Sequence, residues 1–424
     1  MKTMKFVNHR FLKPLETIKE FTSFTAMSVF ANTPEAPPDA IFGVATKYNA
    51  SKLEKKALLS VGVYRTEDGK PYVFNCVREA EKKMLGKHSK DYLPMTGDAA
   101  FVKAAREFLW GPVLPEIADR TASIQSCAGT GALYLVARYV KDHLKVPKIL
   151  LSNPTWANHK AIFSEQGLEL GTYAWAKDCR LDIDACIKSL EDAPEGCVVL
   201  LQACAHNPTG IDPTPEQWKR ILDAVKAKKH IPCFDFAYMG WASGDPDTDA
   251  SVIRNFAKEG NFFFVCFSFS KCMGLYGERV GCVHAVCANA QEAKCVGSQF
   301  ATIGRFTYSV CPQNGSYIAT EVINDPELHK MWLEELKVIS KRVIDIRAKF
   351  VQLLEEKSGK SFDFIAQQKG MFALTGLTPD EVKILGEEEG VFIPANGRIS
   401  VPTLNNSNVD FVAQAVANVV AKRK

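Results

Sequence analysis

The stretch NFFFVCFSFSKCMGLYGERVG, residues 261–281, places a run of aromatic and β-branched residues directly before two serines, a lysine and a glycine-punctuated turn that holds an arginine. The apolar run predicts a buried strand, and the turn residues predict that the chain leaves the sheet near the lysine. An amine, two hydroxyls and a guanidinium at the end of a buried strand can bind an anion. The alternative is a solvated lysine beside a turn, and the rest of the chain decides between the two.

Two further apolar runs, CVVLLQAC (197–204) and IPCFDFAY (231–238), predict strands that neighbour the strand at 262–270. Strands that alternate with helices predict a mostly parallel sheet with helices on both faces. In such sheets ligands collect at the carboxyl ends of the strands. Three residues with useful chemistry lie at or just past such ends: Asn207, Asp235 and Lys271.

Helix signals flank these strands. Residues 98–110, DAAFVKAAREFLW, place apolar side chains on one helical face, with Asp98 as the predicted N-cap. The following segment, SIQSCAGTGALYLVARYV, predicts a short strand, a glycine turn and a helix that starts near Gly131. Thr214 and Gln217 predict a capping box for a helix between the two strands of CVVLLQAC and IPCFDFAY.

The pattern changes in the last part of the chain. A long amphipathic helix from about 327 to about 357 is followed by short strands and a second capping box, formed by Thr378 and Glu381. Residues 31–40, ANTPEAPPDA, are proline-rich and predict an extended arm. The predicted division is an N-terminal extension (1–27), an arm with the first part of a small domain (28–70), a large domain (71–335) and the rest of the small domain (336–424).

The composition narrows the class of protein. The chain has 424 residues, 46% of them hydrophobic and 24% charged, which is typical of globular proteins. Its net charge is only +4 and no basic stripe is interleaved with aromatics, so nucleic acid is not an expected partner. Thirteen cysteines without a C-x-x-C pair predict free thiols and no metal site. The apolar runs are shorter than the ~20 residues of a membrane helix.

Taken alone, each candidate residue has an ordinary alternative. A lysine in a Ser/Gly turn is commonly a solvated charge. The segment GTGAL (129–133) lacks the full G-x-G-x-x-G of a dinucleotide fingerprint. Asp235 is also placed to cap a helix, and His159 has the alternative of a hydrogen-bonded core histidine.

Together and in order, these segments resemble the aspartate aminotransferases, which are pyridoxal-phosphate enzymes of fold type I. The segments that carry the resemblance are SFSKCMGLYGERVG, HNPTG, FDFAY, NGRIS, VGVYR (61–65), KDYLPMTGDAAF (90–101), GTGAL (129–133), NPTWANH (153–159) and GRFTYS (304–309). The similarity covers nearly the whole chain after Met27. It implies an α/β fold in which a large domain holds a mostly parallel seven-stranded sheet between helices, beside a smaller α+β domain.

The resemblance gives the catalytic residues their roles. Lys271 supplies the amine that holds the cofactor aldehyde and then carries a proton, which requires a depressed ammonium pKa. Asp235 matches the carboxylate that keeps the cofactor ring nitrogen protonated. Tyr238 and Asn207 match hydrogen-bond donors to the ring's phenolic oxygen, and Trp156 matches the indole stacked on the ring.

The anion predicted by the opening stretch is then the phosphate of pyridoxal phosphate. The resemblance assigns it two hydroxyls, one guanidinium, two backbone N–H groups at the start of a helix, and a tyrosine from the partner subunit. These residues are Ser268, Ser270, Arg279, Gly129, Thr130 and Tyr92.

Two arginines define the substrate that the resemblance implies. Arg398 in NGRIS matches the residue that binds the α-carboxylate. Arg305 in GRFTYS matches the residue that reaches from the other subunit to bind the side-chain carboxylate. Together they select dicarboxylates, because losing one partner leaves a guanidinium unpaired. The substrate-binding set also includes Gly62, Trp156 and Asn207.

The chain departs from the family pattern at four positions. A histidine is usual where this chain has Gln202, and it extends a hydrogen-bond chain from the ring-binding carboxylate through His159. Glutamine can still donate and accept, so the chain of bonds is expected to survive at Gln202. Ala128 replaces a phosphate-binding serine, and Cys272 and Val310 replace asparagines. These changes predict altered cofactor affinity or pH profile, and no change of reaction class.

The activity implied by the resemblance is the reversible conversion of L-aspartate and 2-oxoglutarate into oxaloacetate and L-glutamate, by a ping-pong mechanism in a homodimer with shared active sites. An aromatic amino acid aminotransferase of the same subgroup keeps both arginines and remains an alternative. A catalytically silent binding protein with this fold is the alternative of another class. A nicotinamide dehydrogenase is suggested only by GTGAL.

The N-terminal sequence bears on the compartment. Residues 1–27 carry four Lys or Arg before the first acid, Glu16, which fits a mitochondrial presequence, but Glu16 and Glu20 dilute that signal. The segment SVFANTPEAPPD after Met27 resembles the start of cytosolic family members. The expected location is therefore cytoplasmic, with a mitochondrial location through residues 1–27 as the alternative.

Overall fold

The structure, a computed structural model, describes residues 28–423. The chain divides into two units, with the division between Pro38 and Asp39. Residues 31–40 contain neither helix nor strand, as their prolines predict. The predicted extension, 1–27, lies outside the described residues.

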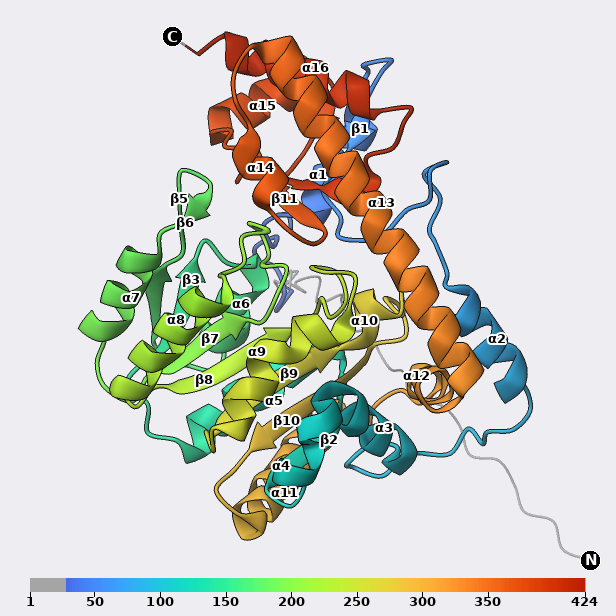
Figure 1. Ribbon diagram of the computed structural model, residues 1–424, viewed down its shortest axis with the longest axis vertical. Helices are drawn as coiled ribbons and strands as arrows, with labels where there is room; N and C mark the ends of the chain where they lie inside the picture. The colour runs from blue at the N-terminus through green and yellow to red at the C-terminus, as the bar shows by residue number, and fades with distance from the viewer. Residues whose placement is uncertain (1–27, 424) are drawn as a thin grey trace, which may run out of the picture. The chain divides into compact units, whose positions relative to one another are not determined.

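A seven-stranded sheet is the centre of the second unit (Figure 1). Its strand order is β2–β10–β9–β8–β7–β3–β4, and β10 alone runs antiparallel to its neighbours. This confirms the predicted mostly parallel sheet. In that order the strands are β2 (Thr121–Cys127), β10 (Val280–Val286), β9 (Phe263–Ser268), β8 (Ile231–Phe236), β7 (Val198–Gln202), β3 (Ile149–Asn153) and β4 (Leu170–Ala174).

Helices cover both faces of this sheet because successive strand residues point to opposite sides. Val199 and Leu201 of β7 belong to one apolar cluster with α7, α8 and α9, whereas Val198 and Leu200 belong to another with α5, α6 and α11. The covering helices are α5 (Ala128–His143), α6 (Ala157–Ser164), α7 (Ile183–Asp192), α8 (Pro215–Ala227), α9 (Pro246–Lys258) and α11 (Ala290–Thr307).

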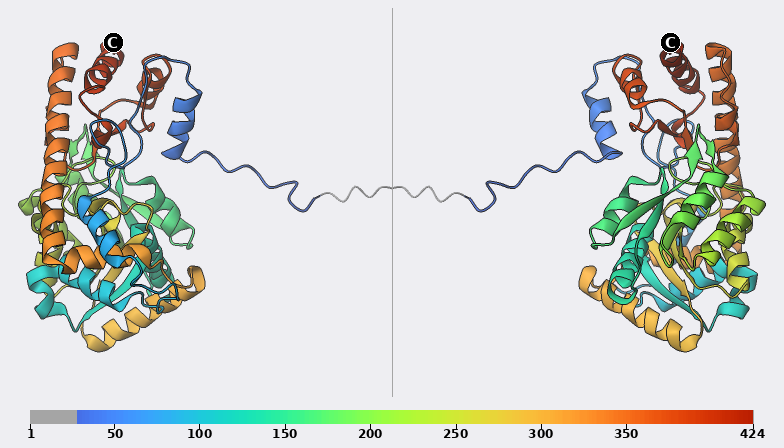
Figure 2. Two further views of the ribbon diagram at one scale, coloured as in Figure 1. Left: turned by 90° about the vertical axis from the view of Figure 1, so that its right-hand side faces the viewer. Right: turned by 90° about the vertical axis from the view of Figure 1, so that its left-hand side faces the viewer.

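One long helix, α13 (Pro326–Ser358), packs against α16 (Val409–Ala421) and also against α2 (Asn75–Met84) and α12 (Asn314–Asn324). Figure 2 shows it as an unbroken helix. The predicted amphipathic helix is confirmed. The predicted domain boundary at 335/336 falls inside α13, and the division into domains stays a prediction.

Two small sheets are formed by strands from the first and the last parts of the described chain. β1 (Ala57–Leu58) pairs in parallel with β12 (Val391–Phe392), and β11 (Phe372–Leu374) pairs antiparallel with β13 (Arg398–Ser400). The remaining elements are α1 (Phe42–Ala50), α3 (Ala99–Trp110), η1 (Gly111–Val113), α4 (Leu114–Ile117), β5 (Ala176–Lys177), β6 (Arg180–Leu181), α10 (Phe269–Cys272), α14 (Asp363–Gln367), α15 (Pro379–Glu387) and η2 (Val401–Thr403).

The predicted caps are present. The Asp98 side chain accepts a hydrogen bond from Phe101 N at the start of α3. Both predicted capping boxes are formed. In each, the threonine side chain accepts from the backbone N–H three residues on, and the side chain of that residue accepts from the threonine N–H. These boxes are Thr214 with Gln217, and Thr378 with Glu381.

Several predicted boundaries at the site were wrong. The strands expected over 197–204 and 231–238 end at Gln202 and Phe236. The helix expected near Gly131 begins at Ala128, so Gly129 and Thr130 lie in its first turn. The strand expected over 262–270 ends at Ser268. There the Ser268 side chain accepts a hydrogen bond from Ser270 N (3.2 Å), which caps the single helical turn α10.

Within residues 28–423, none of the helices combines the length and the apolar composition that a membrane span requires. The same residues contain no group of three or more His, Cys, Asp or Glu side chains arranged to hold a metal ion.

Candidate active site

The predicted site residues meet where β7, β8 and β9 end. Asp235 is the fifth residue of β8, Asn207 follows β7, and Lys271 lies in the helical turn after β9. The three strands are parallel neighbours, so their carboxyl ends lie at one edge of the sheet.

Lys271 lies among charged groups of both signs. Burial lowers the pKa of its amine; the Asp235 carboxylate opposes this, and the positive charges of Arg279 and Arg398 add to it. Its Nζ lies 5.4 Å from the centre of the Tyr238 ring. The side chain keeps part of its surface exposed, so a ligand can reach it. A depressed pKa increases the fraction of neutral, nucleophilic amine.

Asp235 is held by a chain of side-chain hydrogen bonds. Its Oδ2 lies 3.1 Å from Nε2 of His159, and Nδ1 of His159 lies 2.8 Å from Oγ1 of Thr155. His159 is completely buried, and the Trp156 ring meets it edge to face at 5.2 Å. The carboxylate is therefore fixed in position by a histidine that is itself held by the Thr155 hydroxyl, just before α6.

Gln202 does not extend this chain, contrary to the sequence expectation. Its Nε2 donates to the backbone oxygen of Asn207 (2.9 Å), and its Oε1 accepts from the backbone nitrogen of Asn207 (2.8 Å). The structure has no hydrogen bond between Gln202 and His159, both of which it describes. A glutamine amide matches the adjacent N–H and C=O of one backbone residue, and it therefore holds the Asn207 loop instead.

Asn207 connects two other predicted residues. Its Oδ1 accepts from Nη1 of Arg398 (3.1 Å), and its Nδ2 lies 3.4 Å from the Tyr238 hydroxyl. Burial, followed by the charge of Asp235, raises the pKa of Tyr238, so its hydroxyl stays protonated and able to donate.

Arg398 is a buried guanidinium without an anion. It is 3% exposed, donates from Nη2 to the backbone oxygen of Ser60, and forms no ion pair with any described carboxylate. Its Nε has no hydrogen-bond partner in the structure. Burial lowers the pKa of Arg398 to about 10, which leaves it charged at neutral pH. Buried charges are normally paired, so this group is built to receive a carboxylate.

Sequence reasoning missed Phe372, whose ring supports Arg398. The guanidinium carbon lies 4.1 Å from the centre of the Phe372 ring, within cation–π range. A Cβ added to Gly62 would come within 2.6 Å of Cζ of Phe372, so only glycine fits beside this ring. Phe372 begins the short apolar strand β11, within the segment QKGMFALTG, which carries no chemical signal of its own.

The residues predicted to bind phosphate also lie close together. A Cβ added to Gly129 would come within 3.3 Å of Cβ of Ser268 and 4.0 Å of Oδ1 of Asp235, so the start of α5 packs closely against the end of β9. Ser270 is buried beside Ser268. Arg279 donates to the backbone oxygen of Tyr276 (3.0 Å) and forms no ion pair among the described residues.

This arrangement fits pyridoxal phosphate. Two hydroxyls, an unpaired guanidinium and the first N–H groups of a 16-residue helix form a site for a phosphate dianion. The amine of Lys271 and the carboxylate of Asp235 lie next to it, and both are required by an aldehyde on a protonatable ring. Ala128 contributes no hydroxyl and has a φ of 57°, a strained value of the kind found near functional sites.

Two predicted site residues of the chain, Tyr92 and Arg305, do not lie with the other site residues. Tyr92 is 85% exposed. Arg305, in the last turn of α11, is exposed and donates from Nη1 to Oγ of Ser309 (2.6 Å). The sequence expectation places both in the site of a partner subunit, which remains a prediction.

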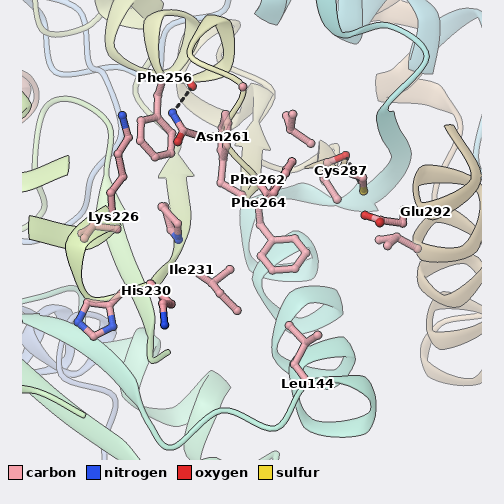
Figure 3. Close-up of a pocket in the computed structure, with 18 of the residues that line it drawn as sticks. Leu144, Lys226, His230, Ile231, Phe256, Asn261, Phe262, Phe264, Cys287 and Glu292 are labelled. Carbon is pink, nitrogen blue, oxygen red and sulfur yellow. Dashed lines mark hydrogen bonds between the residues drawn. The ribbon is translucent and has the colours of Figure 1, made fainter. Parts of the chain in front are cut away.

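A cavity of about 500 Å³ lies away from this site (Figure 3). It is found where β8 and β9 begin, at the amino ends of the strands, and Ile231 and Phe264 are among the residues that line it. None of the predicted site residues lines it.

Comparisons with known proteins identify the family of this chain. The sequence model of the family described as aminotransferase class I and II matches residues 54–416. The cytoplasmic aspartate aminotransferase of Schizosaccharomyces pombe is 42% identical over 402 residues, which is 92% of this chain and 98% of that protein. The mitochondrial aspartate aminotransferase of Dictyostelium discoideum is 39% identical over 95% of this chain and 96% of its own length.

A solved aminotransferase structure is also similar to this chain. The aromatic-amino-acid aminotransferase of Burkholderia pseudomallei, covalently bound to pyridoxal phosphate, superposes with a TM-score of 0.88 at 36% identity, over 93% of this chain and 100% of that one. The chain therefore belongs to the aminotransferase class I and II family, which confirms the fold class, the enzyme class and the pyridoxal phosphate cofactor that its sequence predicts.

Proposed function

We propose that this protein is an aspartate aminotransferase, which reversibly converts L-aspartate and 2-oxoglutarate into oxaloacetate and L-glutamate by a ping-pong mechanism. The observation that carries the proposal is Arg398, a guanidinium that is 3% exposed, bonded to Asn207 and without a carboxylate partner among the described residues. Leaving such a charge unpaired is costly, and the α-carboxylate of an amino acid supplies the missing partner.

The cofactor supplies an aldehyde that bonds to amines and a ring that accepts electrons from the bond being broken. Lys271 would hold the cofactor through its amine, and Asp235 would hold the proton of the ring nitrogen. Ser268, Ser270 and Arg279, with the N-terminus of α5, would bind its phosphate.

The residues around Lys271 suit it to move a proton. Its lowered pKa increases the fraction of neutral amine, which is the form that can take a proton from the substrate Cα as a general base. Tyr238, whose raised pKa keeps its hydroxyl protonated, would donate a hydrogen bond to the ring's phenolic oxygen. Asn207 orients both Tyr238 and Arg398 through its side-chain amide.

Substrate choice depends on both arginines. Arg398 binds the carboxylate that every amino acid carries. In this proposal the partner subunit of a homodimer supplies Arg305 for the second carboxylate, and Tyr92 for the phosphate of the cofactor. The support is that both side chains are exposed in the chain and that neither contacts the site within it.

The substrate test compares the specificity constants for aspartate, tyrosine and kynurenine, with 2-oxoglutarate as acceptor. Aspartate should be preferred because two guanidinium groups await two carboxylates. The aromatic alternative deserves the direct comparison because a structural relative acts on aromatic amino acids. Negligible activity on aspartate would remove the proposal, and a preference for tyrosine would replace it with the aromatic alternative.

A spectroscopic test separates an enzyme from a silent scaffold. Protein loaded with pyridoxal phosphate should absorb visible light through the bond to Lys271, and borohydride should remove that absorption. The matched control is Lys271→Ala, which should bind the cofactor without a borohydride-stable link. An equal covalent link in Lys271→Ala would place the attachment at another residue.

The homodimer is tested by complementation. A Lys271→Ala chain mixed with an Arg305→Ala chain should regain activity, because each heterodimer contains one site with neither defect. Activity that stays at the level of the separate variants would show that both residues serve the site of the same chain.

We also propose a cytoplasmic location, supported by the segment after Met27, while the aspartate aminotransferases similar to this chain include both cytoplasmic and mitochondrial proteins. Mass spectrometry of the mature N-terminus tests it. Removal of residues 1–27 in a mitochondrial fraction would favour the alternative.

A further inference from the structure

A second cavity, of about 570 Å³, lies between α8 and α9, next to the loop that follows β7. We name it the α8–α9 cavity. None of the residues assigned to the reaction lines it. The residues that matter for its chemistry are Asp249, Asp212, Trp218, Leu222, Val252 and Phe256.

One wall of the α8–α9 cavity is apolar and rigid. Trp218 is 5% exposed and Phe256 is 2% exposed, and both pack against Phe234 in the core, with ring centres 6.4 Å and 6.2 Å away. Leu222 and Val252 extend this wall from α8 and α9. Such a surface suits an aromatic or branched aliphatic group.

The cavity is also lined by a buried charged group, the carboxylate of Asp249. This side chain is 7% exposed, and its Oδ2 accepts a hydrogen bond from Ala242 N (3.1 Å). Among residues 28–423 it forms no ion pair, and the Ser243 hydroxyl and the Gly240 backbone are its other hydrogen-bonding neighbours. The pKa of Asp249 is raised to about 6, mainly by burial, which the hydrogen bonds from Ser243 and Ala242 oppose and the charge of Asp212 reinforces. A buried carboxylate facing a cavity without a cation is unusual.

The other charges around the cavity do not supply that cation. Lys219 is paired with Asp223 (2.6 Å), and Lys226 is paired with Glu259. Lys369 also lines the cavity, but its charge acts on Asp212, whose oxygens accept from the backbone nitrogens of Ala205 (2.7 Å) and His206 (3.0 Å). Asp249 is therefore the carboxylate that lacks a positive partner.

We propose that the α8–α9 cavity binds a small organic cation, namely a protonated amine that carries an aromatic or branched aliphatic group. The ammonium pairs with Asp249, and the apolar group lies against Trp218, Phe256, Leu222 and Val252. A metal ion does not fit, because no group of three or more suitable ligands exists among the described residues. This site is separate from the reaction proposed above and does not depend on it.

The test uses N,N-dimethylbenzylamine as the probe. A tertiary amine cannot form an imine with the cofactor aldehyde. The probe therefore cannot bind covalently to the cofactor in place of Lys271. Calorimetric titration of the pyridoxal-phosphate-loaded protein at pH 8, where Asp249 is ionised, should show one site per chain. The neutral N,N-dimethylbenzamide should bind at least tenfold more weakly, and saturating succinate at the active site should leave amine binding unchanged.

Three variants locate the site. Asp249→Asn should weaken amine binding at least tenfold, whereas Asp223→Asn, at a paired carboxylate of the rim, should leave it within about twofold. Val252→Phe fills the cavity while keeping Asp249, and it should also abolish binding, which guards against a fold defect in Asp249→Asn. Equal binding of amine and amide, displacement by succinate, or unchanged binding in Asp249→Asn and Val252→Phe would overturn the proposal.

Discussion

The two arginines assigned to the substrate lie in opposite environments. Arg398, at the start of β13, is buried against the Phe372 ring and bonded to Asn207. Arg305, in the last turn of α11, is exposed, and among the described residues its side chain bonds only to Ser309, just past the helix end. The difference teaches that one chain by itself buries a guanidinium for one carboxylate and leaves the second guanidinium exposed; under the proposed function, a partner subunit uses this second group.

The largest expected effect is that of Arg398→Ala. The change removes the buried charge that receives the α-carboxylate, at a cost of about 3 to 5 kcal/mol in transition-state binding. The specificity constants for aspartate and for alanine should both fall, by roughly two to four orders of magnitude. Steady-state kinetics measure this, with Arg180→Ala, at an exposed ion pair with Asp363, as the control that should remain active. Near-normal kinetics in Arg398→Ala would show that the buried guanidinium does not bind the α-carboxylate.

Arg305→Ala should have a smaller and selective effect. The specificity constant for aspartate should fall about a hundredfold, because a second carboxylate loses its charged partner. That for alanine should change by less than about threefold, since alanine has no second carboxylate. The ratio of the two constants is the measurement. Equal losses for both substrates would mean that Arg305 supports the fold of the site instead of recognising a substrate.

Gly62→Ala sharpens the account of the Arg398 region. The added methyl group would meet Cζ of Phe372 at 2.6 Å, and overpacking of this kind costs about 1 to 3 kcal/mol. The specificity constant for aspartate should fall about tenfold, because the ring that supports Arg398 is displaced. Adding Phe372→Leu in the same chain should restore part of the loss, although Phe372→Leu alone weakens binding. If the double variant recovers no activity, the effect of Gly62→Ala does not act through the Phe372 ring.

The smallest effect concerns the pKa of Lys271 in the cofactor-free protein. The positive charge of Arg398 lowers this pKa, so Arg398→Gln should raise it and leave less neutral amine at pH 8. Acylation of Lys271, followed by mass spectrometry against pH, should then be slower. Asp235→Asn should act in the opposite direction, because the Asp235 carboxylate raises the pKa. Arg305→Gln should shift it less than Arg398→Gln, and an equal shift would place Arg305 beside the amine.

The sequence by itself determined the local structure and the position of the chemistry along it. Apolar runs bounded by turns specified β7, β8 and β9, and the two capping boxes specified where α8 and α15 begin. Both signals depend on residues within a few positions of one another. In a parallel sheet, this was enough to bring Asn207, Asp235 and Lys271 to one edge.

Only the tertiary structure decided which side chains support these residues. Arg398 meets Asn207 across 191 residues of sequence, and Phe372 meets both Arg398 and Gly62 from a strand without chemical signal. Gln202 was expected to continue the chain from His159, but it bonds the Asn207 backbone. Such partners are chosen by the packing of distant segments, where distance and orientation decide between several possible hydrogen bonds, and residue type alone does not fix that choice.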